Sequence, residues 1–303
     1  MKIVSLLPSA TEIVCALGAL EQLVGISHEC DFPEEVKGKA VLTSSRIDPH
    51  GTSLSIDQAV RSVIKDVLSI YAIDEPRLAA LSPDVIVTQD LCEVCAVSLD
   101  DVKSAVARIS HRDDVKIVSL TPTRLGHLWS DIMQVAEGID RREAGSLLCL
   151  SLQARIAAIQ QRSAAAPRLR VASVEWMEPI MLGGTWMPEL IALAGGIPIG
   201  AAAGEMAPTI KPDELTRLNP EVVLVKPCGF TLARTLEERA VIERDILGSV
   251  GAETRVYATD GNAFFNRPGP RLVESLEIMA ACVHPTLFDD FAKKHADVIY
   301  RLR

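Results

Sequence analysis

The chain has 303 residues, of which 48% are hydrophobic, 23% charged and only 4% aromatic, and its net charge is −9. This composition is that of a folded globular protein with room for two ordinary domains, and not that of a disordered chain. The net negative charge, together with the lack of a dense stripe of lysine and arginine, argues against nucleic acid as a partner. No apolar stretch approaches the ~18 residues that a membrane span needs.

The first segments predict a strand, a helix and a second strand. Residues 3–7 read as a buried strand, and the spacing from Ser9 to Glu12 is that of a capping box that starts a helix with Ser9 as its N-cap. Gly18 is suited to end that helix in a left-handed conformation. Residues 23–27 read as the next strand.

The pattern continues as alternating helices and strands. A helix is predicted near 57–67, followed by strands at 85–88 and 116–120 with a helix at 99–110 between them. Residues 124–163 keep helical periodicity, with one break at 138–140, so a long helix is expected within 141–163. A strand at 169–174 then opens a second series, which ends in helices at 272–281 and 287–302.

One unit occurs twice. Residues 77–87 are echoed by residues 214–224, and in both copies a short helix ends at a Leu-x-Pro-acid turn before a run of branched apolar residues. Such a run is typical of a strand that is buried on both faces of a parallel sheet. We therefore expect an α/β protein of two Rossmann-like lobes with parallel sheets joined by a long α-helix. The expected domains are 1–123, 124–167 and 168–303, with a ligand cleft between the lobes.

The order of these motifs resembles that of the periplasmic cobalamin- and siderophore-binding proteins of ABC importers, in which a helix forms the backbone between the lobes. The resemblance is strongest to the cobalamin-binding branch. It is carried by residues 3–12, 24–33, both Pro-acid-strand units, 183–196 and 265–271, which together cover nearly the whole chain in order. It implies non-enzymatic binding of a corrinoid such as cobalamin, or of another metal chelate, and delivery to an ABC transporter permease.

The candidate ligand contacts follow the predicted strands, because ligands of open parallel sheets bind at the carboxyl ends of strands. Trp176, Trp186, Phe264 and Phe265 are candidate apolar walls, His28 is a candidate metal ligand through a ring nitrogen, and Arg267 is a candidate partner for an anionic group. The full set of predicted ligand-binding residues is Ser9, His28, Glu29, Phe32, Gln89, Trp176, Trp186, Phe264, Phe265 and Arg267. The structural alternatives are that the tryptophans pack between the lobes and that His28 caps its loop by a hydrogen bond to the backbone.

Four of the seven cysteines also follow predicted strands: Cys30, Cys92, Cys95 and Cys228. Thiolates suit zinc or iron, and a Cys-x-x-Cys spacing serves either one metal ion or a redox pair. The alternative function is therefore that of a cytosolic metal-binding or thiol-redox protein. The competing interpretation is that these cysteines are small buried hydrophobic residues, as we expect for Cys15, Cys149 and Cys282 on helix faces.

The resemblance also implies a docking surface for the transporter, made of one acidic site from each lobe. By position these acids are Asp74, Glu75, Asp213 and Glu214, although acids at a helix start also favour the helix dipole without any partner. The first residues lack the pattern of a secretory leader, and seven is an odd number of cysteines, so the sequence as written predicts a cytoplasmic protein. A periplasmic or extracellular location is expected if a leader has been removed.

Overall fold

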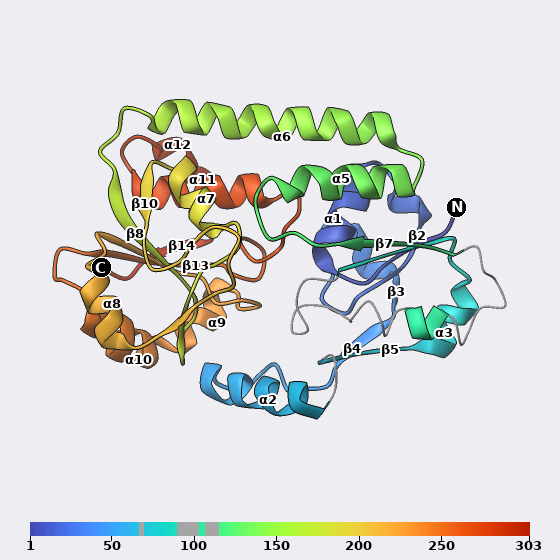
Figure 1. Cartoon of the computed structure of the whole chain (residues 1–303), viewed down its shortest axis with the longest axis horizontal. Helices are drawn as coiled ribbons and strands as arrows, with labels where there is room; N and C mark the ends of the chain where they lie inside the picture. The colour runs from blue at the N-terminus through green and yellow to red at the C-terminus, as the bar shows by residue number, and fades with distance from the viewer. Residues whose placement is uncertain (67–69, 90–102, 107–114) are drawn as a thin grey trace. The chain divides into compact units, whose positions relative to one another are not determined.

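The computed structural model describes residues 1–66, 70–89, 103–106 and 115–303, and the chain forms two compact units (Figure 1). The first unit comprises Met1–Gly51, Gln58–Pro122 and Gly126–Ser151. The second comprises Thr52–Asp57, Thr123–Leu125 and Leu152–Arg303. Each unit is an α/β structure with a sheet of its own, as the sequence predicts.

The first unit contains a five-stranded sheet in the order β3-β2-β1-β6-β7, in which every neighbouring pair is parallel. Its strands are β1 (Ile3–Ser5), β2 (Leu23–Ile26), β3 (Ala40–Val41), β6 (Val85–Gln89) and β7 (Lys116–Leu120). A separate antiparallel pair is formed by β4 (Thr43–Ser45) and β5 (Tyr71–Ile73). The parallel sheet confirms the prediction, because strands read as continuous apolar runs when helices or loops cover both faces.

Helices connect these strands. They are α1 (Pro8–Ala16), α2 (Ser53–Asp66), α3 (Glu75–Leu81) and α5 (His127–Gly138), with short 3-10 turns at Leu20–Gln22 and Glu34–Gly38. Helix α5 packs closely on β7, since a Cβ atom added at Gly138 would lie 2.8 Å from the side chain of Val118. Glycine at this helix end therefore permits the close approach of helix and strand.

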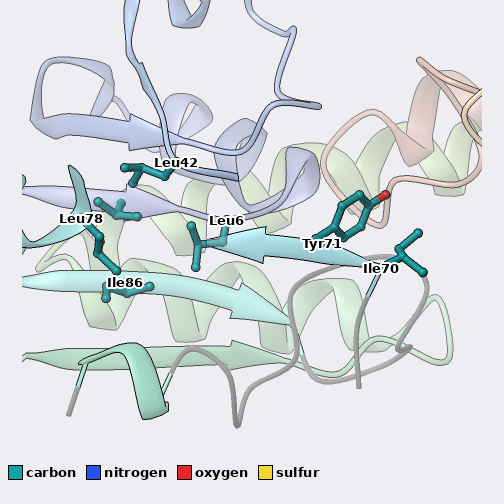
Figure 2. Close-up of a cluster of buried hydrophobic side chains, with 7 residues drawn as sticks. Leu6, Leu42, Ile70, Tyr71, Leu78 and Ile86 are labelled. Carbon is teal, nitrogen blue, oxygen red and sulfur yellow. The ribbon is translucent and has the colours of Figure 1, made fainter. Parts of the chain in front are cut away.

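A cluster of apolar side chains forms part of the core of the first unit. It consists of Val4, Leu6, Leu42, Ile70, Tyr71, Leu78 and Ile86, each at most 9% exposed (Figure 2). Full burial of an aliphatic side chain stabilises a fold by roughly 1.5–3 kcal/mol. The cluster joins strands β1 and β6 to β5 and α3, so it fixes the segment that carries Tyr71 against the main sheet.

The second unit contains a seven-stranded sheet in the order β11-β9-β8-β12-β13-β14, with β10 paired to β8 as well. Its strands are β8 (Leu169–Trp176), β9 (Ile180–Leu182), β10 (Gly196–Pro198), β11 (Thr209–Ile210), β12 (Val222–Val225), β13 (Arg255–Thr259) and β14 (Ile299–Arg301). Strands β10, β8, β12 and β13 are mutually parallel, which confirms the predicted core of the sheet. Strands β9, β11 and β14 pair antiparallel with this core, an addition that the sequence pattern does not predict.

The helices of the second unit are α7 (Met187–Leu193), α8 (Pro212–Leu218), α9 (Leu232–Glu237), α10 (Arg239–Val241), α11 (Leu272–Val283) and α12 (Asp289–Lys294). A π-helical turn at Ile242–Ile246 and a 3-10 turn at Leu247–Ser249 follow α10. The predicted final helix at 287–302 is shorter than expected. It ends at Lys294, and the last residues form β14 beside β13 instead.

Helix α6 (Arg142–Ser163) is the predicted long helix, and the boundary of the two units falls inside it (Figure 1). It follows α5 after the predicted break, where Asp140 adopts a left-handed conformation with φ of 57°. Asp and Asn tolerate this conformation better than most residues, which explains why the helix ends there.

The duplicated sequence folds into a duplicated structure. Helices α3 and α8 both end at a residue in the left-handed conformation, Ser82 with φ of 48° and Asn219 with φ of 45°. The proline that follows each of them cannot continue a helix. Strands β6 and β12 then begin at equivalent places.

The acidic residue after each of these prolines has the same structural role in both copies. Asp84 Oδ2 accepts a hydrogen bond of 2.8 Å from the backbone N–H of Lys2, next to β1. Glu221 Oε2 accepts one of 2.8 Å from the backbone N–H of Arg170, in β8. In each sheet the acid therefore links the start of one central strand to the central strand beside it. This shared role explains why both copies of the repeat contain an acid at this position.

The start of α1 differs from the prediction. The N-cap is Leu7, without a side-chain cap, and Pro8 occupies the first turn. Proline has no N–H to leave unpaired and its φ suits a helix start, so it moves the start ahead of Ser9. Ser9 consequently lies inside the first turn, 2% exposed, and its hydroxyl has no hydrogen-bond partner among the described residues.

Candidate functional site

The loop after β2 places His28 at the carboxyl end of the first sheet. Its backbone N–H and its Nδ1 lie 3.0 Å and 2.7 Å from Thr43 Oγ1, and Thr43 donates its own hydroxyl hydrogen to Ser27 Oγ at 3.1 Å. Because that hydrogen is already used, Nδ1 of His28 must be the donor to Thr43. Desolvation lowers the pKa of His28, against the opposing charge of Glu29, and this favours the neutral imidazole. Nε2 then carries a lone pair, and the residue is exposed.

Tyr71 completes this group, and sequence reasoning missed it. Its hydroxyl donates to Glu29 Oε1 at 2.7 Å, and its ring packs edge-on against His28 with ring centroids 5.1 Å apart. Tyr71 belongs to the apolar cluster of Figure 2, where its hydroxyl points away from the aliphatic side chains. The scarcity of aromatic residues was the one signal in the sequence that could have singled it out.

Cys30 follows in the same loop but is buried, with 5% exposure. Its sulfur lies 3.1 Å from Thr11 Oγ1, whose hydrogen is donated to Ser5 Oγ at 2.8 Å. Ser5 in turn donates to the carbonyl of Leu7 at 3.1 Å. The sulfur of Cys30 therefore belongs to a buried chain of hydrogen bonds that runs through Thr11 and Ser5.

The other predicted ligand contacts of the first unit differ in how exposed they are. Phe32 is 44% exposed, so part of its side chain lies at the surface. Gln89 ends β6 and is 5% exposed. Ser9 is buried in α1, as described above, and is not available to a ligand in this conformation.

Trp176 ends β8 at the carboxyl edge of the second sheet. Its indole N–H donates to the carbonyl of Ser53 at 3.2 Å, and its ring packs edge-on against Phe230 with centroids 5.3 Å apart. The residue is half-buried. The polar edge of the indole is therefore fixed while part of its surface stays accessible, which suits the wall of a binding site.

Lys226 and Glu175 form an ion pair beside Trp176. Lys226 directly follows β12, is fully buried, and donates from Nζ to Asn266 Oδ1 at 2.9 Å and to Glu175 Oε2 at 3.3 Å. A buried lysine is costly unless it is paired and hydrogen-bonded. The sequence pattern alone assigned no role to Lys226; a lone lysine directly after the apolar run of β12 was the available signal.

Two of the predicted aromatic walls lie in the core instead. Phe265 is fully buried, and its carbonyl accepts a hydrogen bond of 2.8 Å from the indole of Trp186, which is 6% exposed. Phe265 has a φ of 67°, a conformation fixed by this bond and by its N–H, which donates to Ser275 Oγ at 2.8 Å. Burial of both rings stabilises the loop after β13, so neither presents a surface to a ligand here.

The remaining predicted residues of that loop have internal partners. Phe264 is half-buried beneath the guanidinium of Arg271, which lies 5.5 Å from the ring centroid. Arg267 is 8% exposed and donates to Asn262 Oδ1 at 3.0 Å. Phe264 thus remains a candidate wall, whereas Arg267 serves the loop itself.

The cysteine hypothesis stays a prediction. Cys92 and Cys95 lie outside the described residues, Cys30 is in the first unit, and the exposed Cys228 is in the second. Within the described ranges, no three His, Cys, Asp or Glu side chains gather in a way that could hold a metal ion. On the helices, Cys149 and Cys282 are buried and Cys15 is partly so, and burial raises the pKa of Cys15 to about 11.

The predicted docking acids all lie at helix starts. Asp74 is the N-cap of α3 and accepts from the N–H of Arg77 at 3.0 Å, with Glu75 next to it. In α8, Glu214 accepts from the N–H of Lys211 at 2.8 Å, and Asp213 pairs with Arg217 at 3.1 Å. The acids of α8 lie in the first turn of the helix, whereas Asp74 precedes α3, so the two pairs are offset and not strictly equivalent. Asp74 and Asp213 are exposed.

Of the helices in the described ranges, none has both the length and the apolar character that a bilayer crossing demands.

A family profile and a known protein sequence both match this chain. The profile of the family described as "Periplasmic binding protein" matches residues 3–263. An uncharacterized ABC transporter substrate-binding lipoprotein of Bacillus subtilis, YvrC, is 24% identical over 300 residues, which is 95% of this chain and 82% of that protein.

Solved structures show the same fold. A periplasmic heme-binding protein from Pseudomonas aeruginosa superposes with a TM-score of 0.70 at 18% identity, over 94% of this chain and 93% of that chain. The periplasmic vitamin B12-binding protein BtuF of Vibrio cholerae superposes with a TM-score of 0.65 at 18% identity, over 96% of this chain and 98% of that chain. Together with the family profile, which spans most of the sequence, these matches establish that the chain belongs to the periplasmic binding protein family.

Proposed function

We propose that this protein binds a corrinoid, or a metal chelate of similar size, without chemical conversion and delivers it to an ABC transporter permease. The family supports a binding role, and its solved members include proteins described as binding heme and vitamin B12. The residues at the carboxyl ends of the strands support a ligand that contains a metal.

The observation that carries the proposal is the contact of 2.7 Å between Nδ1 of His28 and Thr43 Oγ1. Thr43 accepts from Nδ1–H of His28, so Nε2 holds an unshared electron pair on an exposed, neutral imidazole. A neutral imidazole nitrogen is a good ligand for cobalt or iron, and a hydrogen bond at the other ring nitrogen is the usual means of orienting it. His28 is therefore proposed as an axial ligand to the metal of the chelate.

Aromatic surface in each unit supports a large planar ligand. Phe32 is exposed after β2, and Trp176 is half-buried after β8 with its indole N–H already satisfied. Each such ring contributes to binding through the apolar area that it buries against the ligand, before the costs of association are subtracted.

Delivery to a permease is the part of the proposal that rests on the family and on the lipoprotein relative. The exposed Asp74 and Asp213 are proposed as the acids that contact it. This role requires a location outside the cytoplasmic membrane, which is the second of the two locations considered from the sequence.

Calorimetry tests the binding function directly. Ligand-free protein titrated with aquocobinamide should release or absorb heat with a stoichiometry of one ligand per chain. Hemin and a ferric siderophore serve as comparison ligands of the other chelate classes. Absence of binding to all three would overturn the proposal.

A further inference from the structure

We propose that Glu175 makes the site selective for chelates that present hydrogen-bond donors, and that the buried Lys226 is the positioning residue that holds its carboxylate for this purpose. The inference rests on the proposed function and narrows its ligand to amide-bearing chelates as opposed to carboxylate-bearing ones.

Lys226 has no exposed surface and its ammonium group has well-defined partners. Nζ donates to Asn266 Oδ1 at 2.9 Å and to Glu175 Oε2 at 3.3 Å, and it lies 6.0 Å from the centroid of the Phe265 ring. Removing an ammonium ion from water costs several kcal/mol, and an opposite charge with further hydrogen bonds must offset that cost. The Glu175 carboxylate is therefore held beside Lys226 by the need to neutralise a buried cation.

This ion pair ties together three adjacent strands at their carboxyl ends. Glu175 belongs to β8, Lys226 follows β12, and Asn266 lies in the loop after β13. The amide of Asn266 also donates to the carbonyls of Lys226 at 3.3 Å and Gly261 at 2.8 Å. The carboxyl edge of three neighbouring strands is where an open parallel sheet presents its ligand site.

At Gly261, the loop after β13 approaches the loop after β12 so closely that no side chain would fit. A Cβ atom there would lie 2.1 Å from the carbonyl oxygen of Pro227 and 2.6 Å from that of Lys226. The backbone of the two loops is thus packed directly around the ion pair. Such packing restricts the rotamers of Glu175 and Lys226, which is the requirement for a positioned ligand contact.

One oxygen of Glu175 remains available. Oε2 binds Lys226, and the side chain is 24% exposed, whereas Lys226 is not exposed at all. Within the described part of the chain, Oε1 has no hydrogen-bond partner. A carboxylate oxygen accepts hydrogen bonds only, so it binds an amide N–H and repels a carboxylate. The ammonium group of Lys226, which could attract an anionic ligand, is fully buried.

Two corrinoids that differ in this chemistry test the assignment. Aquocobinamide carries side-chain amides on the corrin ring, and cobyrinic acid carries carboxylates on the same ring. Wild-type protein should bind the amide form more tightly. Glu175→Gln should reduce that preference by about tenfold, equivalent to about 1.4 kcal/mol, which is the size of one hydrogen bond to a charged group.

Glu178→Gln is the matched control, because Glu178 is three residues further along, is also partly exposed and pairs with Arg244 at 2.7 Å. It changes the net charge equally and should keep the preference. The double variant Lys226→Met with Glu175→Gln removes both charges, which guards against misfolding caused by an unpaired buried cation. It too should lose the preference while binding cobinamide.

The outcomes separate the two proposals. Equal affinity of the wild type for both corrinoids, an unchanged preference in Glu175→Gln, or an equal loss in Glu178→Gln would each overturn the selectivity role and leave chelate binding intact. A wild type that binds neither corrinoid nor hemin would overturn the proposed function itself, and the selectivity role with it.

Discussion

Ser53 and Glu238 meet through two hydrogen bonds across 185 positions of sequence: the N–H of Ser53 donates to Oε1 at 2.7 Å, and its hydroxyl donates to Oε2 at 2.5 Å. Ser53 is the first residue of α2, so the carboxylate caps this helix from outside. Arg234 also donates to Glu238 at 2.9 Å, and Glu238 is only 7% exposed. Ser53, Glu238 and Trp176 all belong to the second unit, so this contact fixes the first turn of α2 within that unit.

Glu238→Ala should lower the free energy of unfolding by about 1–3 kcal/mol, because it leaves buried donors of Ser53 without an acceptor. Urea denaturation measures this loss. Glu237→Ala is the control, since Glu237 pairs with the same Arg234 but is 68% exposed. Equal effects of the two substitutions would show that Glu238 does not cap α2.

The second prediction concerns stability in acid. Burial raises the pKa of Glu277, but its bonds to His295, Lys294 and Arg155, at 2.7–2.8 Å, outweigh this and lower the pKa to about 2. A depressed pKa in the folded state contributes stability that is present above the unfolded value of 4.5 and is lost as pH falls toward 2. We expect a loss on the order of 2–3 kcal/mol over that range.

Glu277→Gln should remove this part of the pH dependence and be less stable than the wild type at pH 6. Unfolding by urea at pH 6, 4 and 3 measures it. A variant whose stability falls with pH as steeply as that of the wild type would contradict the role of Glu277.

The carboxyl group of Asp131 should contribute to stability with the opposite dependence on pH. It lies in α5 with 2% exposure, and burial raises its pKa to about 7, although a backbone hydrogen bond from Thr121 lowers it. Its Oδ2 has no partner in the part of the chain that the structure describes. Since the folded pKa lies above the unfolded value of 3.8, this group favours folding below pH 4, and that contribution is lost as pH rises through 7.

Asp131→Asn should therefore be more stable than the wild type at pH 8, by roughly 1–3 kcal/mol, and similar to it at pH 4. Thermal or urea unfolding at the two pH values is the measurement. A variant that is less stable at pH 8 would indicate that the carboxylate has a partner when ionised.

Gly261→Ala should disrupt the ion pair of Lys226 and Glu175. The added Cβ would lie 2.1 Å from the carbonyl oxygen of Pro227, so the loop after β13 must move. Overpacking of this kind typically costs about 1–3 kcal/mol. Gly251→Ala is the control, because its nearest contact would be an ordinary 3.6 Å. Unchanged unfolding of Gly261→Ala would contradict the close packing of these loops.

Much of the fold follows from local sequence pattern. The apolar runs of β6 and β12 predict buried parallel strands, and the Leu-x-Pro-acid turn predicts where α3 and α8 end. These features depend on neighbouring residues, which a sequence displays directly. The short antiparallel strands β9, β11 and β14 were missed because two or three residues carry too little periodicity to be recognised.

The candidate site was predicted less completely. His28 and Trp176 are predicted as ligand contacts because they follow strands, but the hydrogen bond of His28 depends on Thr43, which is brought to it by a separate antiparallel pair. The pairing of Tyr71 with Glu29 and of Lys226 with Asn266 likewise spans about forty residues. Trp186 and Phe265 are predicted as walls of the ligand site but are buried, because composition does not distinguish an aromatic wall from an aromatic core.

The central claim is that this protein binds the metal of a chelate through Nε2 of His28. The most direct measurement is the absorption spectrum of ligand-free protein titrated with aquocobinamide, because replacement of cobalt-bound water by imidazole shifts the corrin bands. Wild type and Thr43→Ser, which keeps the hydroxyl, should both show the shift, and His28→Ala should lose it and bind at least tenfold more weakly. Wild-type spectra that stay identical to those of free aquocobinamide, or a full shift in His28→Ala, would contradict the account.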